Sequence, residues 1–487
     1  MFAMDIGPVK LLTYALRLAA VLAFWYLARK RLFAAAVVQS LGYATYGVLI
    51  IPIIRSVFAV QIGYLFGAVL LVEALRQGLH RRGLRGTVIP PGRDDCPRSR
   101  GAIFVHLVLA LFCVSVLSYL VRGAAEYTQP GRMLLERLSR EVLPCCIVAL
   151  IPGQEQLRRC WRVGFWCAAI LTSAYLVVSL AALARGVSPS DLRTLPLLGH
   201  YLGAGAGIGI TLVVMSVYFL PSRRQAGTAG TVTSGDCPPW SLLVFALVSA
   251  AALALLAGTR TFAVLVPTVA GLCLLFPPPQ RFGHARITIA SALVGTALLL
   301  PILLSSSPPA QSAFSDQYGF LRERFQGGYG LEMPFRQRTW QRAWALFKQH
   351  PLLGGGEANS GIVLTTYNPA IRETISFRMH QHSLYMKYLG EQGFAGSVLL
   401  LLIIANFLVS RLHMTQVGRW PAPTAVVGQG AWVMGVCGLV RGVAGRAAGL
   451  FLGTAFLVAA LDTGSQEAFL SRPTGRKKRE EVRHTVS

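Results

Sequence analysis

Charged residues are scarce in this sequence of 487 residues, and acidic residues are the scarcest of them. Only 14% of the residues are charged, whereas 54% are hydrophobic and the mean hydropathy is +0.53. A soluble globular protein carries about 25% charged residues, so this composition excludes an ordinary soluble enzyme. The few charges collect between apolar stretches of about 17 to 22 residues, which are long enough to cross a bilayer. The sequence therefore predicts an all-α, polytopic transmembrane helical bundle.

The shortage of acidic residues leaves a large positive charge. The chain has 46 Lys and Arg against 20 Asp and Glu, which gives a formal net charge of +26. In a membrane protein such an excess is typical of cytoplasmic loops. A nucleic-acid-binding protein would instead gather its basic residues on one folded surface with interleaved aromatic residues. No stretch of the sequence does so, and we expect no nucleic acid partner.

Cysteine is absent from the longest polar stretch, residues 307–393. The nine cysteines lie in apolar segments or in predicted cytoplasmic loops, which argues against a disulfide framework. No CxxC pair or His-rich tract has the spacing of a metal site, so we expect no metal and no cofactor. Internal repeats are missing as well.

About thirteen apolar segments are candidate membrane spans. They are residues 10–28, 33–54, 56–75, 101–121, 142–152, 163–184, 199–220, 238–257, 262–277, 287–306, 394–410, 424–440 and 447–461. The fifth contains Pro144 and Pro152 and is too short to span alone, so it is either re-entrant or extended by residues 138–141. No small-residue cleavage site follows the first segment, and we expect it to be an anchor rather than a cleaved signal peptide.

Basic residues mark every second loop between these segments. Examples are Arg29 after the first segment, Arg158 after the fifth and Arg411 after the eleventh. If these loops are cytoplasmic, the N-terminus lies outside and the basic tail inside. The predicted regions are N-terminal transmembrane helices (1–306), a large extracytoplasmic loop (307–393), C-terminal transmembrane helices (394–462) and a basic cytoplasmic tail (463–487).

The predicted outer loop has the periodicity of two interfacial helices. Trp340, Ala343, Trp344 and Phe347 recur at helical spacing and predict one apolar face, and Pro351 ends this helix. A second helical pattern runs from about 382 to 392, before Gly393 leads into the next span. Long loops in compact proteins are often functional, although a cap without chemistry is the alternative.

Ionisable residues of this loop are candidates for chemistry. A neutral imidazole from His380 or His382 is a natural general base for a hydroxyl, and the guanidinium groups of Arg336 and Arg338 match phosphate oxygens. The two histidines are also compatible with a weak metal site or with ordinary interfacial residues. Arg260 lies between two apolar segments on the same predicted side, where a charge is costly unless it reaches the lipid headgroups or has a function.

These residues resemble the signature of the O-antigen ligase and O-antigen polymerase superfamily. Arg336-Gln337-Arg338-Thr339-Trp340, followed by His350-Pro351-Leu352-Leu353-Gly354-Gly355-Gly356, is similar to its Arg-x-x-x-Trp and His-Pro-Leu-Leu-Gly-x-Gly motifs. His382-Ser383-Leu384-Tyr385, with Leu389, Glu391, Gly393 and Gly396, is similar to its His-Asn-x-Tyr-Leu and Glu-x-Gly-x-x-Gly pattern. Thr259-Arg260-Thr261 matches its Ser-Arg-x turn. The motifs cover about 258–396.

The resemblance implies a multi-pass enzyme of the bacterial inner membrane, with its active site on the periplasmic face. Such an enzyme moves a glycan from an undecaprenyl-diphosphate carrier to a hydroxyl of a glycan or lipid-core acceptor. By position, His382 corresponds to the catalytic histidine, and Arg260 and Arg336 correspond to the arginines that hold the diphosphate. We assign substrate contacts to Arg338, His380, Trp340 and Tyr385. Membrane lipids and a chain-length regulator are further candidate partners.

Two departures from the family pattern affect these assignments. Serine stands at 383 in place of the usual asparagine, and the neighbouring histidine is at 380 rather than adjacent to His382. The reaction itself needs little more than these groups, because the departing diphosphate is already a stable anion. We predict displacement with inversion, with His382 as base and no required metal.

The signature does not separate a ligase from a polymerase, since both use a lipid-diphosphate donor. A transporter of lipid-linked glycans is a rival from another class, and it would predict inverted repeats and ionisable residues near the middle of the membrane. A membrane scaffold that has lost catalysis is the third alternative.

Overall fold

The fold is described from a computed structural model of the chain. The described residues are 8–42, 58–85, 99–122, 130–185, 202–218, 240–257, 269, 329–356, 359–360, 362–368, 373–379, 383–416, 422–441 and 448–470.

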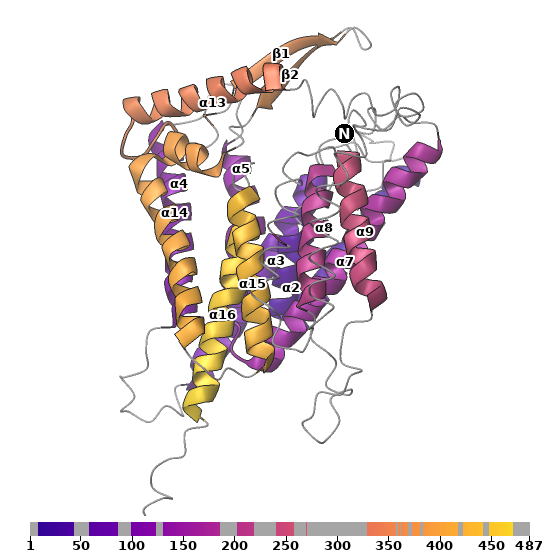
Figure 1. Ribbon diagram of the computed structural model, residues 1–487, viewed down its shortest axis with the longest axis vertical. Coiled ribbons are helices and arrows are strands. Elements are labelled where there is room, and N and C mark those ends of the chain that lie inside the picture. The colour runs from indigo at the N-terminus through magenta and orange to yellow at the C-terminus, as the bar shows by residue number, and fades with distance from the viewer. Residues whose placement is uncertain are drawn as a thin grey trace, which may run out of the picture.

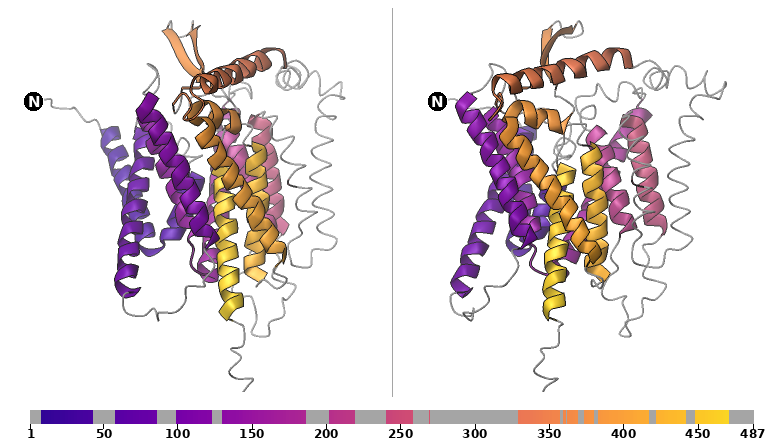
Figure 2. Two further views of the ribbon diagram at one scale, coloured as in Figure 1. Left: turned by 90° about the vertical axis from the view of Figure 1, so that its left-hand side faces the viewer. Right: turned by 60° about the vertical axis from the view of Figure 1, so that its left-hand side comes forward.

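The described chain is mainly a bundle of helices that run roughly parallel to one axis (Figures 1 and 2). Its long helices are α1 (Pro8–Lys30), α2 (Leu32–Gly42), α3 (Phe58–Arg85), α4 (Arg100–Arg122), α7 (Gln154–Ala184), α8 (Leu202–Val217), α9 (Trp240–Ala257), α14 (Leu384–Gln416), α15 (Ala422–Arg441) and α16 (Ala448–Leu470). Many large apolar side chains on their outer faces are exposed, which is what a bilayer as solvent requires.

Three of these helices are long and apolar enough to cross a membrane. They are Arg100–Arg122, Gln154–Ala184 and Leu384–Met414, and shorter apolar helices accompany them at Leu32–Leu41, Ile208–Val217, Thr424–Leu439 and Gly449–Ser465. The prediction of a helical membrane protein is therefore confirmed. The predicted spans 262–277 and 287–306 lie outside the described residues apart from residue 269, and the number of spans stays a prediction.

The short fifth segment is the end of a longer compound helical element, which includes residues 138–141. It consists of α5 (Pro130–Arg137), a π-helix (Leu138–Val142) and α6 (Leu143–Ala149). A β-carbon on Gly67 of α3 would collide with Ser139, and the Gln39 side chain of α2 donates to the Ser139 carbonyl over 3.1 Å. The π-helix is therefore packed tightly against α2 and α3.

The core of the bundle lies where α7, α8, α15 and α16 meet. Trp161 of α7 is fully buried there, and its Nε1 donates to the Tyr218 carbonyl at the end of α8 over 2.8 Å. Its ring meets Phe456 of α16 edge-on with centroids 5.3 Å apart. Gly430 of α15 leaves room for the indole, since a β-carbon there would lie 2.7 Å from it.

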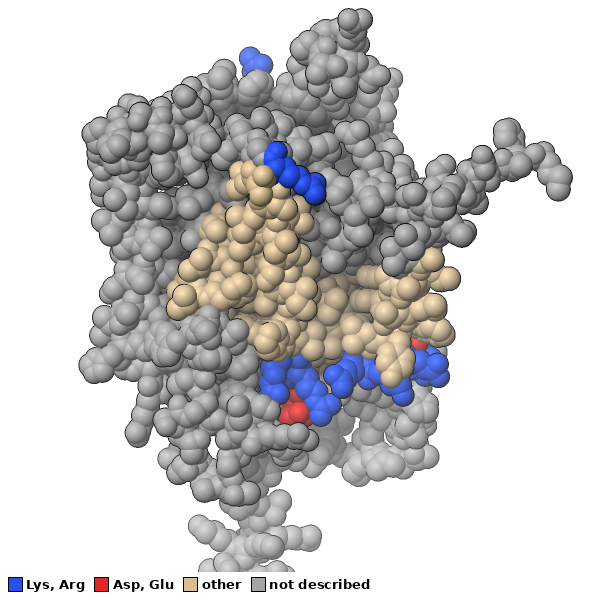
Figure 3. Space-filling view, turned by 90° about the vertical axis from the view of Figure 1, so that its right-hand side faces the viewer, with Lys and Arg blue, Asp and Glu red and all other residues tan. Residues whose placement is uncertain are grey.

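The two ends of the bundle are built from different elements. At one end α13 (Tyr329–Gln349) crosses over α4 and α14, with the strands β1 (Ile362–Asn368) and β2 (Glu373–Met379) beside it (Figure 1). Near the opposite end a band of Lys and Arg borders an apolar surface (Figure 3). There Asp462 of α16 accepts hydrogen bonds from the backbone amides of Arg100 and Gly101, both over 2.9 Å, and so caps α4.

The end that carries α13 contains more than the two predicted helices. Strands β1 and β2 form an antiparallel hairpin with Ile362 opposite Met379 and Asn368 opposite Glu373. The all-α prediction did not include these two strands at 362–368 and 373–379. The residues explain the hairpin, since Ile362–Asn368 and Glu373–Met379 contain β-branched and aromatic side chains, which favour strands.

Candidate active site

The signature residues that follow α13 form a turn that is docked on the start of α14. Four backbone hydrogen bonds of 2.8 to 3.1 Å join the two segments: Gly355 N to Gly390 O, Gly356 N to Glu391 O, Phe394 N to Pro351 O and Ala395 N to Leu352 O. The two halves of the motif, about 40 residues apart in sequence, are thus paired through their backbones. The His-Pro-Leu-Leu-Gly-Gly-Gly motif therefore has a structural role in this protein.

Three glycines of this pairing, among them Gly356 with φ 97°, have conformations that L-residues rarely adopt. Two of the three also lie where a β-carbon would collide with the other segment. Gly354 has φ 68° and Gly393 has φ 61°. A β-carbon on Gly393 would lie 2.5 Å from the Gly354 nitrogen and 2.6 Å from the Pro351 oxygen. Gly393 also kinks α14, so that the predicted short helix before it and the predicted span after it meet at this residue. Both glycines are required by backbone conformation and by the close approach of two chain segments.

Helix α13 lies close to α14 because the facing residues are small. Ala343 is fully buried, and a β-carbon on Gly390 would lie 2.8 Å from its Cα. Thr339 is buried as well, whereas Trp340 and Trp344 are 41% and 46% exposed. The predicted apolar face is therefore correct for Ala343, but the side of α13 that packs on α14 includes Thr339 and leaves the two tryptophans largely outside.

Ser383 begins α14 as its N-cap. Its side chain is buried, its Oγ lies 3.4 Å from the Met386 amide, and its carbonyl accepts the first helical hydrogen bond, from Lys387 N over 3.0 Å. Serine and asparagine are both good N-cap residues because their short side chains accept a bond from the first helical turn. This explains why serine can replace asparagine at this position of the motif.

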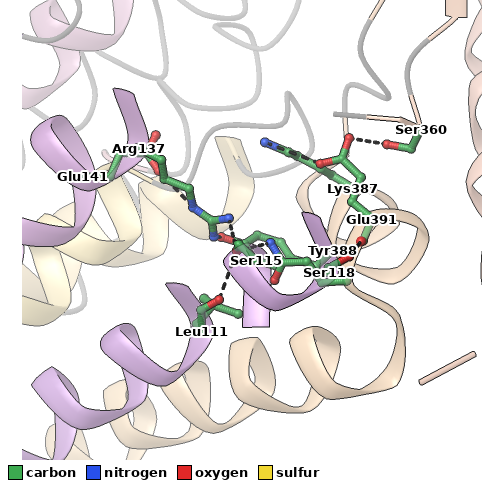
Figure 4. Close-up of polar contacts among 10 residues, drawn as sticks. Leu111, Ser115, Ser118, Arg137, Glu141, Ser360, Lys387, Tyr388 and Glu391 are labelled. Atoms are coloured by element: carbon green, nitrogen blue, oxygen red, sulfur yellow. Dashed lines mark hydrogen bonds and ion pairs between the residues drawn. The ribbon is translucent and has the colours of Figure 1, made fainter. Parts of the chain in front are cut away.

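Glu391, the acidic residue of the second motif, is buried and makes contacts that hold the docked turn. It is 1% exposed, its Oε1 accepts a short hydrogen bond from Ser360 Oγ, and its Oε2 lies 4.0 Å from Lys387 Nζ (Figure 4). The backbone carbonyl of Glu391 also lies 2.8 Å from Ser118 Oγ of α4, which in turn is 2.7 Å from the Leu353 carbonyl. Ser118 and Glu391 thus fasten the docked turn to the bundle.

Arg137 was not singled out from the sequence, yet it lies beside the signature. It is 7% exposed at the end of α5, and it donates to Ser115 Oγ over 2.8 Å and, in a short bond, to the Tyr388 hydroxyl. Its guanidinium carbon lies 4.8 Å from the centroid of the Tyr388 ring, and Glu141 Oε2 is 4.0 Å from its Nε. In sequence the only signal is an Arg and a Glu four residues apart next to an apolar segment.

The structure describes the predicted site residues that lie on α13 and α14. Arg338, Trp340 and Tyr385 are exposed, the first two on α13 and the third in the first turn of α14. Arg336 belongs to α13, but its side chain is outside the described residues. Arg260, His380 and His382 also lie outside them. Among the described residues no three His, Cys, Asp or Glu side chains are grouped as a metal site.

Comparison with known families supports the resemblance seen in the motifs. A family model described as O-antigen ligase matches residues 245–401. This part of the chain is similar to an O-antigen ligase domain. The match supports the similarity of this chain to membrane enzymes of the O-antigen ligase and polymerase type, and the matched residues include Arg260, Arg336 and His382. No curated protein matches the chain.

Proposed function

We propose that the protein is a glycosyltransferase of the bacterial inner membrane that moves a glycan from an undecaprenyl-diphosphate carrier to an acceptor hydroxyl. The observation that carries the proposal is the O-antigen ligase match over residues 245–401, which includes each residue of the proposed catalytic set. The docking of the turn 351–356 on the start of α14 supports it, because the motif residues make specific contacts with one another.

His382 is the proposed general base, and it removes the proton of the acceptor hydroxyl as that oxygen attacks the anomeric carbon. The bond from this carbon to the diphosphate oxygen breaks, and the lipid diphosphate leaves as an anion. Because this leaving group needs no protonation, the demanding tasks are deprotonation of the nucleophile and stabilisation of negative charge. Attack opposite the leaving group inverts the anomeric centre.

Arg260 and Arg336 are the proposed diphosphate ligands, and Arg338 assists them. Guanidinium groups suit this role because their planar forks bind two phosphate oxygens at once and stay charged at every physiological pH. His380, Trp340 and Tyr385 are proposed to contact the sugars. The exposure of Arg338, Trp340 and Tyr385 is compatible with access by a substrate.

The proposed reaction takes place on the extracytoplasmic side. Helix α13 and the hairpin lie at the end of the bundle away from the basic band (Figures 1 and 3). Because Lys and Arg are enriched on the cytoplasmic side of membrane proteins, this arrangement favours a periplasmic position for the signature.

The replacement His382→Ala tests the base. Reintroduced into cells that lack the native protein, it should lower the amount of transferred glycan by at least about 100-fold, because proton transfer by a positioned side chain contributes at least this much. His106→Ala is the matched control, since His106 is an exposed histidine of α4 that bonds the carbonyl of Ala102 in its own helix. Glycan transfer near the wild-type amount by His382→Ala, with equal protein in the membrane, would refute the assignment.

The same cells distinguish a ligase from a polymerase. Loss of a polymerase leaves single repeat units on the acceptor, whereas loss of a ligase leaves long chains on the carrier lipid. Purified protein in liposomes, given donor and acceptor on the outer side only, should still form product. No product under these conditions, together with movement of the donor from one leaflet to the other, would favour transport instead.

A further inference from the structure

A buried polar network joins the three helices α4, α5 and α14 beside the docked signature turn. Ser115 Oγ of α4 is its centre: it donates to the Leu111 carbonyl over 3.0 Å and accepts from Arg137 over 2.8 Å and from Gln392 Nε2 over 2.6 Å (Figure 4). A hydroxyl has one donor and two acceptor sites, so these three bonds use its full capacity.

Arg137 connects this network to the first turns of α14. It donates to the Tyr388 hydroxyl and lies over the same ring, so that the position and the tilt of the ring are both constrained. Through Ser115 it is also linked to Gln392, one helical turn further along α14. Arg137 thus contacts, directly or through one atom, the two successive turns that precede the kink at Gly393.

The backbone that carries Arg137 is itself held in place by neighbouring helices. The π-helix that begins at the next residue is packed against Gly67 of α3 and bonded by Gln39 of α2. A guanidinium on this rigid support can transmit the position of the N-terminal helices to α14. Burial of an arginine costs stability, and π-helices are often found at functional sites. Both features therefore indicate that Arg137 has a functional role.

We propose that Arg137 is a positioning residue for the proposed transfer reaction: it holds the first turns of α14, whose N-cap Ser383 directly follows His382 in the sequence. This role rests on the proposed function, in which His382 is the general base. Arg137 acts through Tyr388, Ser115 and Gln392, and it does not bind the diphosphate, because its described donors are directed to protein hydroxyls.

Steady-state kinetics of the full-length protein in liposomes tests this role, with the host's own undecaprenyl-diphosphate-linked glycan as donor. Arg137→Met should lower kcat by about tenfold or more and leave the KM for the donor within about twofold, and Arg137→Lys should recover part of kcat. Arg159→Met is the matched control, because Arg159 is an exposed arginine paired with Glu155 at 3.0 Å. A raised KM with unchanged kcat would overturn the proposal, since it would indicate donor binding.

The variant Tyr388→Phe keeps the ring and removes only the hydroxyl. We expect it to fold, so it tests the same path even if Arg137→Met does not fold. It should lower kcat, and the double variant with Arg137→Met should be no worse than Arg137→Met alone, because the hydroxyl acts through the guanidinium. Additive losses, or a kcat for Tyr388→Phe equal to that of the wild type, would overturn the proposed path.

Hydrogen exchange provides a readout that does not depend on activity. In Arg137→Met the amides of residues 384–394 should exchange faster, by about tenfold, while those of α15 keep their rates and Arg159→Met changes neither. Unchanged exchange in 384–394 would overturn the positioning role even if transfer were observed. Conversely, if the wild-type protein transfers no glycan, the proposed function fails, and the exchange rates still decide whether Arg137 holds this helix.

Discussion

At the scale of single residues, several motif positions are explained by backbone geometry rather than by catalysis. Gly354 and Gly393 both have positive φ, and each lies where a side chain would collide with the other segment. Ser383 caps α14, which an asparagine would do equally well. A motif of this family therefore combines residues that support the fold of the site with residues proposed to react there.

The replacement Gly393→Ala tests this explanation. It should destabilise the protein by about 1 to 3 kcal/mol, because a β-carbon forces the residue out of the positive-φ region and against the Pro351 carbonyl. The measurement is the midpoint of thermal unfolding in detergent. Gly78→Ala is the control, since nothing lies within 4 Å of a β-carbon on this helical glycine, and it should be neutral or stabilising. Equal midpoints for the two variants would contradict the prediction.

At the scale of elements, glycine allows α15 and α16 to approach each other closely. Gly449 and Gly453 of α16 are four residues apart and face Gly438 and Gly435 of α15. Helices in membranes associate through such small residues because lipid provides no hydrophobic driving force between them. The close contact of these helices near the core follows from this pattern.

The two glycines of α16 make a matched pair of substitutions. Gly453→Ala should lower the unfolding midpoint, because its β-carbon would lie 2.5 Å from the Gly435 nitrogen, whereas Gly449→Ala should have little effect at 3.4 Å from the Gly438 Cα. We expect a difference of about 1 to 3 kcal/mol between the variants, measured by unfolding in detergent. A larger loss for Gly449→Ala would show that the two helices pack differently.

At the scale of the whole molecule, the basic residues in every second predicted loop predict the orientation in the membrane. A reporter fused after Ser487 should be cytoplasmic, because the tail carries Arg476, Lys477, Lys478 and Arg479. A reporter inserted after Asn359 should be extracytoplasmic. Enzymatic reporters that are active on only one side of the membrane measure both. Activity of both fusions on the same side would contradict the predicted topology.

Much of this architecture was predictable from the sequence. The apolar segments correspond to helices such as α4, α7 and α14, and the short segment before Pro152 is extended through residues 138–141, because length and hydropathy are local properties. The helix that contains Trp340 and the break at Gly393 were predictable for the same reason. The hairpin at 362–379 was missed, because the interpretation of that stretch depended on helical periodicity alone.

The amino-acid sequence by itself determined the membrane-spanning class, the positions of the apolar helices and the family motifs, because each of these depends on the composition or spacing of neighbouring residues. Only the tertiary structure decided that the two motif halves pair through their backbones and that Arg137, more than 200 residues before Tyr388, is bonded to it. These contacts depend on where distant helices pack, and periodicity carries no information about which helix faces are brought together.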